Sequence, residues 1–292
     1  MDNKIFKGHK GKNQWTIYPY DCIKAMKQIP DESIDCIITS PPYLNKRSYG
    51  QVGREQGNKA MYKYAASGKP LEYEIGCNQN IDEYFNSINQ VFKLCYVLLK
   101  PDKFFFFNIG NLRRNKETTD ISHIFVQMAK DIGFKHRDTI IWVKNNPRPV
   151  PPNSEIYWLD NGWEYLLMFS KGTGTIDREK YDLTVKNNCK VCKTQQEFEK
   201  TKPNYFKTNI GYTEESIKHE HPAKFPLSLP RFVLQLCTKE NDTILDPFAG
   251  VGTTLIAGLQ LNRNVIGCEL NYDYCEKAVD EIKKTIFIIN KP

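Results

Sequence analysis

The stretch Asn241-Asp-Thr-Ile-Leu-Asp-Pro-Phe-Ala-Gly-Val-Gly-Thr-Thr-Leu-Ile-Ala-Gly-Leu-Gln-Leu-Asn-Arg-Asn-Val-Ile-Gly-Cys-Glu-Leu270 decides the fold of this 292-residue chain. Its apolar pattern predicts a buried strand at 243–245, a glycine-bearing turn at 246–253, a helix at 254–261 and a strand at 264–268 that ends at Glu269. Such a βαβ unit is typical of nucleotide-binding sheets, in which the turn approaches the ligand and the acidic residue meets a ribose. We therefore expect an adenosine-containing ligand at this turn.

The glycine turn differs from the dinucleotide fingerprint Gly-x-Gly-x-x-Gly, because it contains only the first two glycines. It instead resembles the methyl-donor loop of S-adenosylmethionine-dependent amino-methyltransferases. This resemblance implies that S-adenosylmethionine is the cofactor and that the loop backbone surrounds its methionine part. The loop residues concerned are Asp246, Pro247, Phe248, Gly250, Gly252, Thr253 and Thr254. The alternative is that the glycines only turn the chain between core elements.

The length and composition indicate one α/β core with an inserted or appended module, because 40% of the 292 residues are hydrophobic and 12% are aromatic. No apolar run is long enough for a membrane span, and the first residues lack the apolar core of a signal peptide, so we expect a soluble cytoplasmic protein with no membrane partner. Nine scattered cysteines favour reduced thiols over a disulfide framework. The net charge of +7 suggests a polyanionic partner.

A basic segment at residues 44–70 contains six Lys or Arg residues and one Glu, without clean periodicity. We predict a long basic loop. On charge alone it could be a solvated surface loop, but its place directly after the motif that ends at Tyr43 favours contact with a polyanionic partner through Lys46, Arg47 and Arg54.

That motif is Asp35-Cys-Ile-Ile-Thr-Ser-Pro-Pro-Tyr43. The sequence before it predicts a strand at 15–18, a short helix at 22–28 and a buried strand at 34–39. Two consecutive prolines cannot continue a central strand, so they fix a rigid turn at its carboxyl end, where ligands bind in open α/β sheets.

The two motifs together resemble the DNA amino-methyltransferases. Their order along the chain is similar to that of the circularly permuted β group. The resemblance implies an α/β fold with a mixed, mostly parallel seven-stranded Rossmann-like sheet, helices on both faces, and the two motifs on neighbouring strands. It also implies that Asp21 binds the adenine of the donor, that Glu269 binds the ribose, and that Lys224, Phe225 and Pro226 contact the donor's carboxylate end.

The chemistry of an exocyclic amine explains the residue types of the proline motif. The amine lone pair is delocalised into the base, so acceptors such as Ser40 Oγ and the Pro41 carbonyl would pull the nitrogen toward tetrahedral geometry and stabilise developing charge. The base has to leave the duplex to reach the pocket, and Tyr43 offers a ring for it to stack on. The expected catalytic residues are Ser40, Pro41, Pro42 and Tyr43.

The remaining pattern predicts the rest of the sheet. We expect helices at 81–99, 121–132, 227–238 and 272–286, a turn at 100–103, and strands at 104–109, 139–143 and 164–169, the last two as a hairpin. The aromatic run 104–107 is interpreted as core, because successive strand residues point to opposite faces. In the resembling family Trp142 and Lys144 line the target-base pocket; a plain connector is the alternative.

Residues 171–220 are polar, and the resemblance implies that they form a target-recognition region between a catalytic half at 1–170 and a donor-binding half at 221–292. Cys189 and Cys192 could be half of a zinc site with His219 and His221, but there is no second cysteine pair and we expect no metal.

The target base is expected to be cytosine, methylated at N4, because Ser at position 40 accompanies that specificity in the resembling family. The alternatives are an adenine-N6 DNA methyltransferase, an RNA base methyltransferase and a catalytically silent nucleic-acid-binding protein. The expected partner is double-stranded DNA. A cognate restriction endonuclease and a homodimer are further possibilities.

Overall fold

The computed structural model describes residues 4–44, 71–114, 117–147, 159, 161–177, 204–208 and 226–289. Several predicted residues lie outside these ranges, so the predictions that rest on them remain predictions. They are Lys46, Arg47, Arg54, Cys189, Cys192, His219, His221, Lys224 and Phe225.

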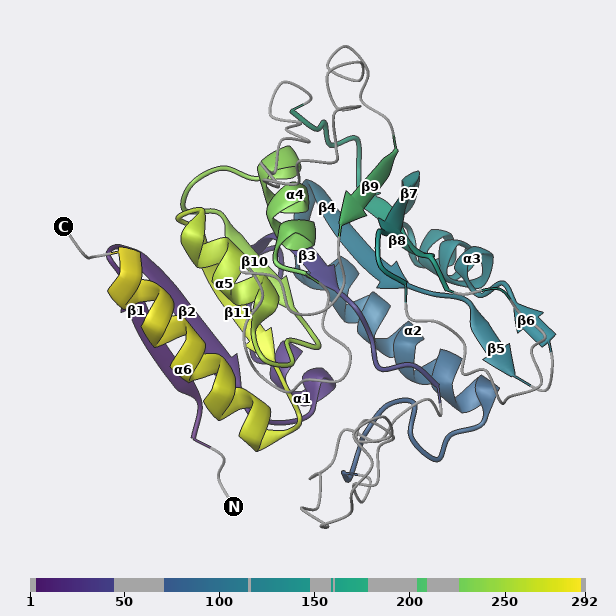
Figure 1. Ribbon diagram of the computed structural model, residues 1–292, viewed down its shortest axis with the longest axis horizontal. Coiled ribbons are helices and arrows are strands. Elements are labelled where there is room, and N and C mark those ends of the chain that lie inside the picture. The colour runs from purple at the N-terminus through teal and green to yellow at the C-terminus, as the bar shows by residue number, and fades with distance from the viewer. Residues whose placement is uncertain are drawn as a thin grey trace.

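A mixed, mostly parallel sheet forms the centre of the molecule (Figure 1). In spatial order the nine strands within the described ranges are β1 (Phe6–Lys10), β2 (Asn13–Tyr18), β11 (Asn264–Cys268), β10 (Thr243–Asp246), β3 (Ile34–Thr39), β4 (Leu99–Ile109), β8 (Trp163–Lys171), β7 (Lys135–Lys144) and β9 (Tyr205–Thr208). The strands from β2 to β4 are parallel, and β7 and β8 form the predicted antiparallel hairpin. A separate two-stranded ribbon joins β5 (Leu112–Arg114) and β6 (Glu117–Thr119).

The predicted fold class is confirmed, but the predicted number of seven strands is too small. The two additional strands are at the edges, where β1 pairs with β2 and β9 pairs with β7. Neither has a hydrophobic pattern: β1 reads Phe-Lys-Gly-His-Lys, and β9 lies within the polar residues 171–220. Edge strands are held by backbone pairing on one side only, so their sequences carry less of the apolar signal that marks a central strand.

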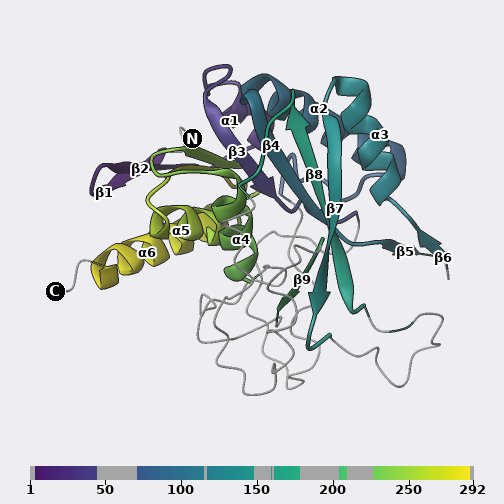
Figure 2. The ribbon, with the colours of Figure 1, turned by 90° about the horizontal axis from the view of Figure 1, so that it is seen from above.

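Helices cover both faces of the sheet, as predicted (Figure 2). One face carries α1 (Cys22–Met26), α2 (Ile81–Leu98) and α3 (Ser122–Ile132), and the other carries α4 (Ser228–Cys237), α5 (Thr253–Gln260) and α6 (Tyr272–Ile289). Phe105 and Phe107 belong to the core on the α2 face, whereas Phe104 and Phe106 belong to the opposite core. The aromatic run is therefore core, as its alternation predicts. None of the described helices is long and apolar enough to cross a membrane.

The turn predicted at residues 100–103 is wrong, because β4 runs through them. Ile34 of β3 pairs with Leu99, and Cys36 pairs with Phe104, so the intervening residues of β4 form a bulge. Asp102 in this bulge has a left-handed φ of 59°. These residues favour a turn locally, and the chain accommodates them as a bulge within the strand.

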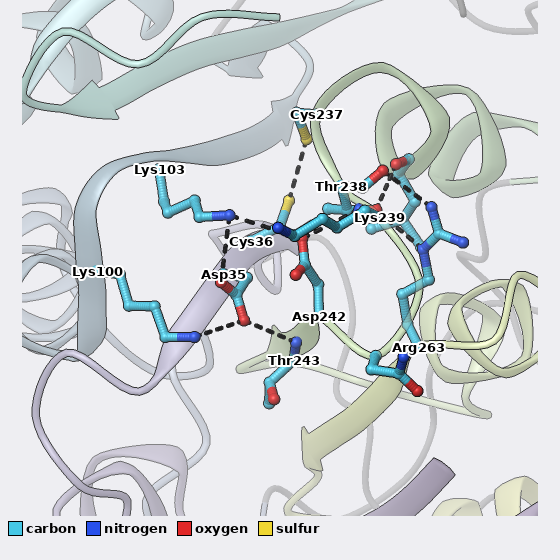
Figure 3. A network of polar contacts seen from close by, with 12 residues as sticks. Asp35, Cys36, Lys100, Lys103, Cys237, Thr238, Lys239, Asp242, Thr243 and Arg263 are labelled. Atoms are coloured by element: carbon cyan, nitrogen blue, oxygen red, sulfur yellow. Dashed lines mark hydrogen bonds and ion pairs between the residues drawn. The ribbon is translucent and has the colours of Figure 1, made fainter. Parts of the chain in front are cut away.

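A network of charged residues joins the amino ends of β3, β4 and β10 (Figure 3). Asp35 accepts hydrogen bonds from Lys100 Nζ at 2.8 Å and from the Thr243 amide at 3.0 Å, and Lys103 Nζ lies 3.2 Å from its other oxygen. Lys103 also lies 3.6 Å from Asp242. The network therefore ties together the ends of the strands that carry both motifs, at the edge of the sheet away from the two turns.

The seven cysteines in the described part of the chain are free thiols. Cys36 and Cys237 lie close together, with 3.6 Å between their sulfur atoms (Figure 3). Burial raises the pKa of the Cys36 thiol well above its ordinary value, so it remains protonated and weakly reactive.

Candidate active site

The proline turn and the glycine turn line one pocket at the carboxyl ends of β3, β10 and β11. Strands β3 and β10 are direct parallel neighbours, since Ile244 pairs with Cys36 and Leu245 with Ile37. Their following residues must therefore leave the sheet side by side. The pocket wall consists of Asp21 and Cys22, residues 40–43, Leu71 and residues 73–75, residues 246–251 with Thr253, and residues 268–270.

Asp246 joins the two motifs through its buried carboxylate. Thr39 Oγ1 and the Phe248 amide donate hydrogen bonds to Oδ1 at 2.6 and 3.0 Å, and Thr254 Oγ1 donates to Oδ2 at 2.6 Å. Burial raises its pKa to about 6, against the lowering effect of the two threonine hydroxyls and the amide. Asp246 lines the pocket, but its hydrogen bonds to Thr39 and the Phe248 amide fix the loop and the end of β3. This geometry makes it first of all a positioning group.

Glu269 holds the glycine turn from the end of β11. Its Oε2 accepts the Gly250 amide at 2.8 Å, and its Oε1 accepts the Asn271 amide at 2.8 Å. Burial raises its pKa to about 7, and the charges of Asp246 and Glu74 act in the same direction. A carboxylate at the end of the second strand, facing the pocket, is the arrangement that ribose-binding sites of this topology use.

Left-handed backbone explains both glycines of the turn, since φ is 53° at Gly250 and 82° at Gly252. A Cβ at Gly252 would also lie 3.0 Å from the Cβ of Ala278 on α6. Gly252 is the N-cap of α5, and Thr253, the first residue of this helix, lines the pocket. The tight turn thus places backbone next to the cavity, as the sequence predicts.

Hydrogen bonds of two tyrosine hydroxyls hold the proline turn in place. Tyr84 Oη on α2 donates to the Pro42 carbonyl at 3.0 Å. Tyr43 Oη accepts the Gly110 amide at 3.1 Å and donates to Glu164 Oε2 at 3.1 Å. Ser40, Pro41, Pro42 and Tyr43 all line the pocket.

The family model for N6/N4 DNA methylases matches residues 34–280, which include both motifs and both strands that carry them. The chain belongs to this DNA methylase family. Among curated relatives, the Type II methyltransferase M.HinfI of Haemophilus influenzae is 30% identical over 276 residues, covering 92% of this chain and 69% of the relative. M.BslI of Bacillus sp. (strain NEB-606), a Type II beta methyltransferase, is 27% identical and M.MwoI of Methanothermobacter wolfeii is 28% identical.

This family member spans only 26% of the length of M.BslI and 33% of M.MwoI, although the matches cover 89% and 93% of its own chain. Among solved structures, the PvuII DNA methyltransferase (cytosine-N4-specific) has a TM-score of 0.66 at 20% identity, covering 94% of this chain and 92% of that one. M1.HpyAVI, solved as a SAM complex, has a TM-score of 0.53 at 21% identity, covering 91% and 99%. At these identities the two structures support the fold.

Asp21 is the remaining predicted donor residue that lines the pocket of this family member. It follows β2, the strand next to β11, and its Oδ1 accepts the Lys24 amide at 2.9 Å as the N-cap of α1. Three further predicted donor residues do not belong to the pocket wall, namely Gly252, Thr254 and Pro226. Thr254 is buried behind the loop against Asp246, and Pro226 lies two residues before α4, where its carbonyl accepts the Leu229 amide at 3.1 Å.

Trp142 is not among the residues that line this pocket, so its role in a target-base pocket stays a prediction. Its side chain is 3% exposed and belongs to the core on the α4 face, because its position in β7 points it inward. Lys144 is also absent from the wall and instead donates to Glu164 Oε1 at 2.6 Å. It therefore reaches the proline turn only indirectly, through Glu164 and Tyr43.

Leu71 and residues 73–75 close one side of the pocket, and no role for them was predicted from the sequence. Glu74 is 7% exposed, and its Oε2 accepts the Leu71 amide at 2.9 Å. Gly76 has a left-handed φ of 83°, and a Cβ there would lie 3.2 Å from the Tyr43 carbonyl oxygen. The only signal in the sequence was a glycine shortly before the N-cap of α2.

No group of three or more His, Cys, Asp or Glu residues within the described ranges could hold a metal ion. The possible zinc ligands Cys189 and Cys192 lie outside those ranges.

Proposed function

We propose that this chain transfers a methyl group from S-adenosylmethionine to an exocyclic amine in double-stranded DNA, and that the amine is cytosine N4. The observation that supports this most is that the Ser40-to-Tyr43 turn and the Asp246-to-Thr253 turn line one pocket from adjacent parallel strands. A methyl donor and its acceptor have to meet within bonding distance, and the resembling enzymes use these two motifs for the two reactants.

The residues present fit S-adenosylmethionine. Its adenine would lie toward Asp21, its ribose hydroxyls toward Glu269, and its methionine part along the glycine turn, where Phe248 supplies apolar surface. Four carboxylates, those of Asp21, Glu74, Asp246 and Glu269, line the pocket and complement the positive charge of the donor. The cofactor supplies an activated methyl group. M1.HpyAVI, which shares the fold, is described as a SAM complex.

The chain's own residues would activate the amine. Ser40 Oγ and the Pro41 carbonyl would accept its hydrogen bonds, which favours the tetrahedral nitrogen of the transition state and stabilises its developing positive charge. The methylated amine is acidic and loses its proton afterwards, so the mechanism needs no strong base. Tyr43 would stack on the everted base and offset part of the unstacking free energy, a few kcal/mol.

Ser40 supports cytosine N4, and the similarly folded PvuII enzyme is named as cytosine-N4-specific. Adenine N6 is the second candidate, because both amines have similar geometry. We further propose that the chain is of the β group, with the circular permutation, and that residues 171–220 read the target while Lys46, Arg47 and Arg54 contact the backbone. The Type II names of the relatives support a restriction-modification setting with a cognate endonuclease. A homodimer is part of the same proposal and is tested by mass in solution.

The test is incubation of the purified protein with methyl-labelled S-adenosylmethionine and unmodified duplex DNA, followed by mass spectrometry of the nucleosides. We expect N4-methylcytosine. N6-methyladenine would establish the second candidate, and label in RNA alone would contradict both. Ser40→Ala serves as the control for the pocket, since it should bind the donor but transfer at least tenfold more slowly if it loses an amine acceptor.

A further inference from the structure

The Tyr43 hydroxyl is held on two sides by groups from other strands. The Gly110 amide, directly after β4, donates to Tyr43 Oη at 3.1 Å. The hydroxyl in turn donates to Glu164 Oε2 on β8, also at 3.1 Å. A phenol donates and accepts hydrogen bonds close to the plane of its ring, so one accepted and one donated bond together restrict the plane in which the ring can lie.

Glu164 is itself fixed by a short ion pair. Lys144 Nζ on the neighbouring strand β7 lies 2.6 Å from Oε1, and the exposed fractions of the two side chains are only 9% for Lys144 and 14% for Glu164. The Lys144 ammonium also lies 5.3 Å from the centre of the Trp142 ring. A largely buried ion pair adds little net stability, so its geometry is more informative than its energy. Here it directs one carboxylate oxygen at Tyr43.

Gly110 allows these groups to meet. A Cβ at this position would lie 3.3 Å from Glu164 Cγ and 3.6 Å from Tyr43 Oη. A side chain at this position would therefore crowd the Glu164 side chain beside Tyr43. The end of β4 and the start of β8 thus converge on one phenolic oxygen.

We propose that Glu164, held by Lys144, is a positioning residue that sets the ring of Tyr43 for stacking on the target base. This inference rests on the proposed function, because it assigns a task to a ring of that same pocket. It explains why the aromatic residue of the turn is a tyrosine, since a phenylalanine would lack the hydroxyl that both partners hold. Glu164 acts only through Tyr43 and does not contact the reacting atoms.

A double-mutant cycle tests the proposal. Methyl transfer to duplex DNA is measured for the wild type, Tyr43→Phe, Glu164→Ala and the double variant, with kcat, KM for DNA and the donor Kd determined separately. Each single variant should lower kcat about tenfold, the effect of one lost orienting hydrogen bond on the barrier, and leave donor Kd unchanged. The double variant should be no slower than Tyr43→Phe, because the hydroxyl is the only route by which Glu164 acts.

Glu164→Gln keeps an acceptor and should recover most of kcat, and it replaces Glu164→Ala if that variant does not fold. Lys171→Met is the matched control, because it removes an ion pair with Glu32 at the other end of the same strand, 2.9 Å in length. It should leave kcat unchanged. Additive losses in the cycle, or a normal kcat for Glu164→Ala, would overturn the positioning role in an active enzyme. A wild type that transfers no methyl group to DNA would overturn the proposed function and this inference with it.

Discussion

Asp246 has two oxygens that accept three hydrogen bonds, from Thr39, Thr254 and the Phe248 amide. Asp246→Ala removes all three acceptors and leaves a small cavity. We expect a loss of about 2–4 kcal/mol in the free energy of unfolding and weaker donor binding, because the loop is no longer fixed to β3. Chemical denaturation and calorimetric titration with S-adenosylmethionine measure the two effects. Wild-type donor affinity in a folded variant would contradict the loop assignment.

Asp246→Asn separates the charge of this residue from its shape. The raised pKa of about 6, against an ordinary 3.8, means that the folded state favours the protonated carboxyl. The stability that this group contributes is therefore fully present below about pH 3.8 and is lost as the pH rises through 6. The asparagine variant has no such slope. Its stability relative to the wild type should increase by about 2–3 kcal/mol between pH 4 and pH 7.5 in urea denaturation, and a constant difference would show that Asp246 is not protonated in the fold.

Glu269 should make donor binding depend on pH. Its pKa is raised to about 7, so part of the population is protonated at neutral pH, and the positively charged donor favours the ionised form. Binding should therefore release protons and tighten by up to about tenfold between pH 6 and pH 8. Glu269→Gln should bind more weakly and flatten this dependence. Calorimetry in two buffers of different ionisation enthalpy measures the proton release, and a profile shared by wild type and variant would assign the titration to another group.

The residues that were predictable are those in a local pattern. Asp246 and Glu269 each follow a buried strand, so their place at the carboxyl edge of the sheet follows from the order of apolar and polar residues. Glu74, Gly110 and Glu164 were not predictable, because pairing of strands and packing of a loop bring them to Tyr43 or to the pocket. Nothing in their own neighbourhoods distinguishes them from ordinary loop or strand residues.

At the scale of an element, β11 lies so close to the donor loop that Gly267 has no space for a side chain. A Cβ there would lie 2.8 Å from the Cβ of Ala249 in the loop and 2.9 Å from Leu255 Cδ1 on α5. Gly267→Ala should therefore push the loop away from the strand, lower the stability by about 1–3 kcal/mol and weaken donor binding severalfold. Thermal denaturation and donor titration measure both.

Gly162→Ala is the matched control, because no atom of the described residues lies within 4 Å of the position of its Cβ. It should match the wild type in both measurements. A Gly267→Ala variant with unchanged donor affinity would show that the loop can shift without cost to the pocket.

Elements buried in the centre were predicted most accurately, and the sheet edges least. The strands at Ile34–Thr39 and Asn264–Cys268 begin and end where their apolar runs do. The edge strands β1 and β9 are specified by pairing with β2 and β7 rather than by their own residues. The bulge at 100–103 was misread because local sequence favours a turn, whereas alignment with β3 on both sides keeps the chain in the sheet.

At the scale of the whole molecule, the two ends of the central parallel strands serve two different tasks. The carboxyl ends of β3 and β10 carry the pocket, and the amino ends of the same strands carry the charged network around Asp35 (Figure 3). The strands hold the network at a fixed distance from the pocket, and within the described part of the chain the network does not contact the pocket residues that would take part in the reaction. Stability and catalysis should therefore respond separately to substitution at the amino edge.

Asp35→Asn tests this separation, because asparagine can still accept the Thr243 amide while the charge facing Lys100 and Lys103 is lost. Burial of Asp35 acts to raise its pKa, but the hydrogen bonds from Lys100 and the Thr243 amide and the nearby Lys103 outweigh burial and lower the pKa. Its stabilisation is thus present above the ordinary value of 3.8 and is lost as the pH falls through the lower folded value. The variant should be about 1–3 kcal/mol less stable at pH 7, with a difference that shrinks below pH 4, and its kcat at a temperature where it is folded should equal that of the wild type.

Lys284→Met is the control, because it breaks an exposed ion pair with Glu281 and should change neither the stability nor kcat. A lower kcat for fully folded Asp35→Asn would mean that the network at the amino ends of the strands controls the alignment of the two motif turns. It would then control more than the stability of the strands that carry them.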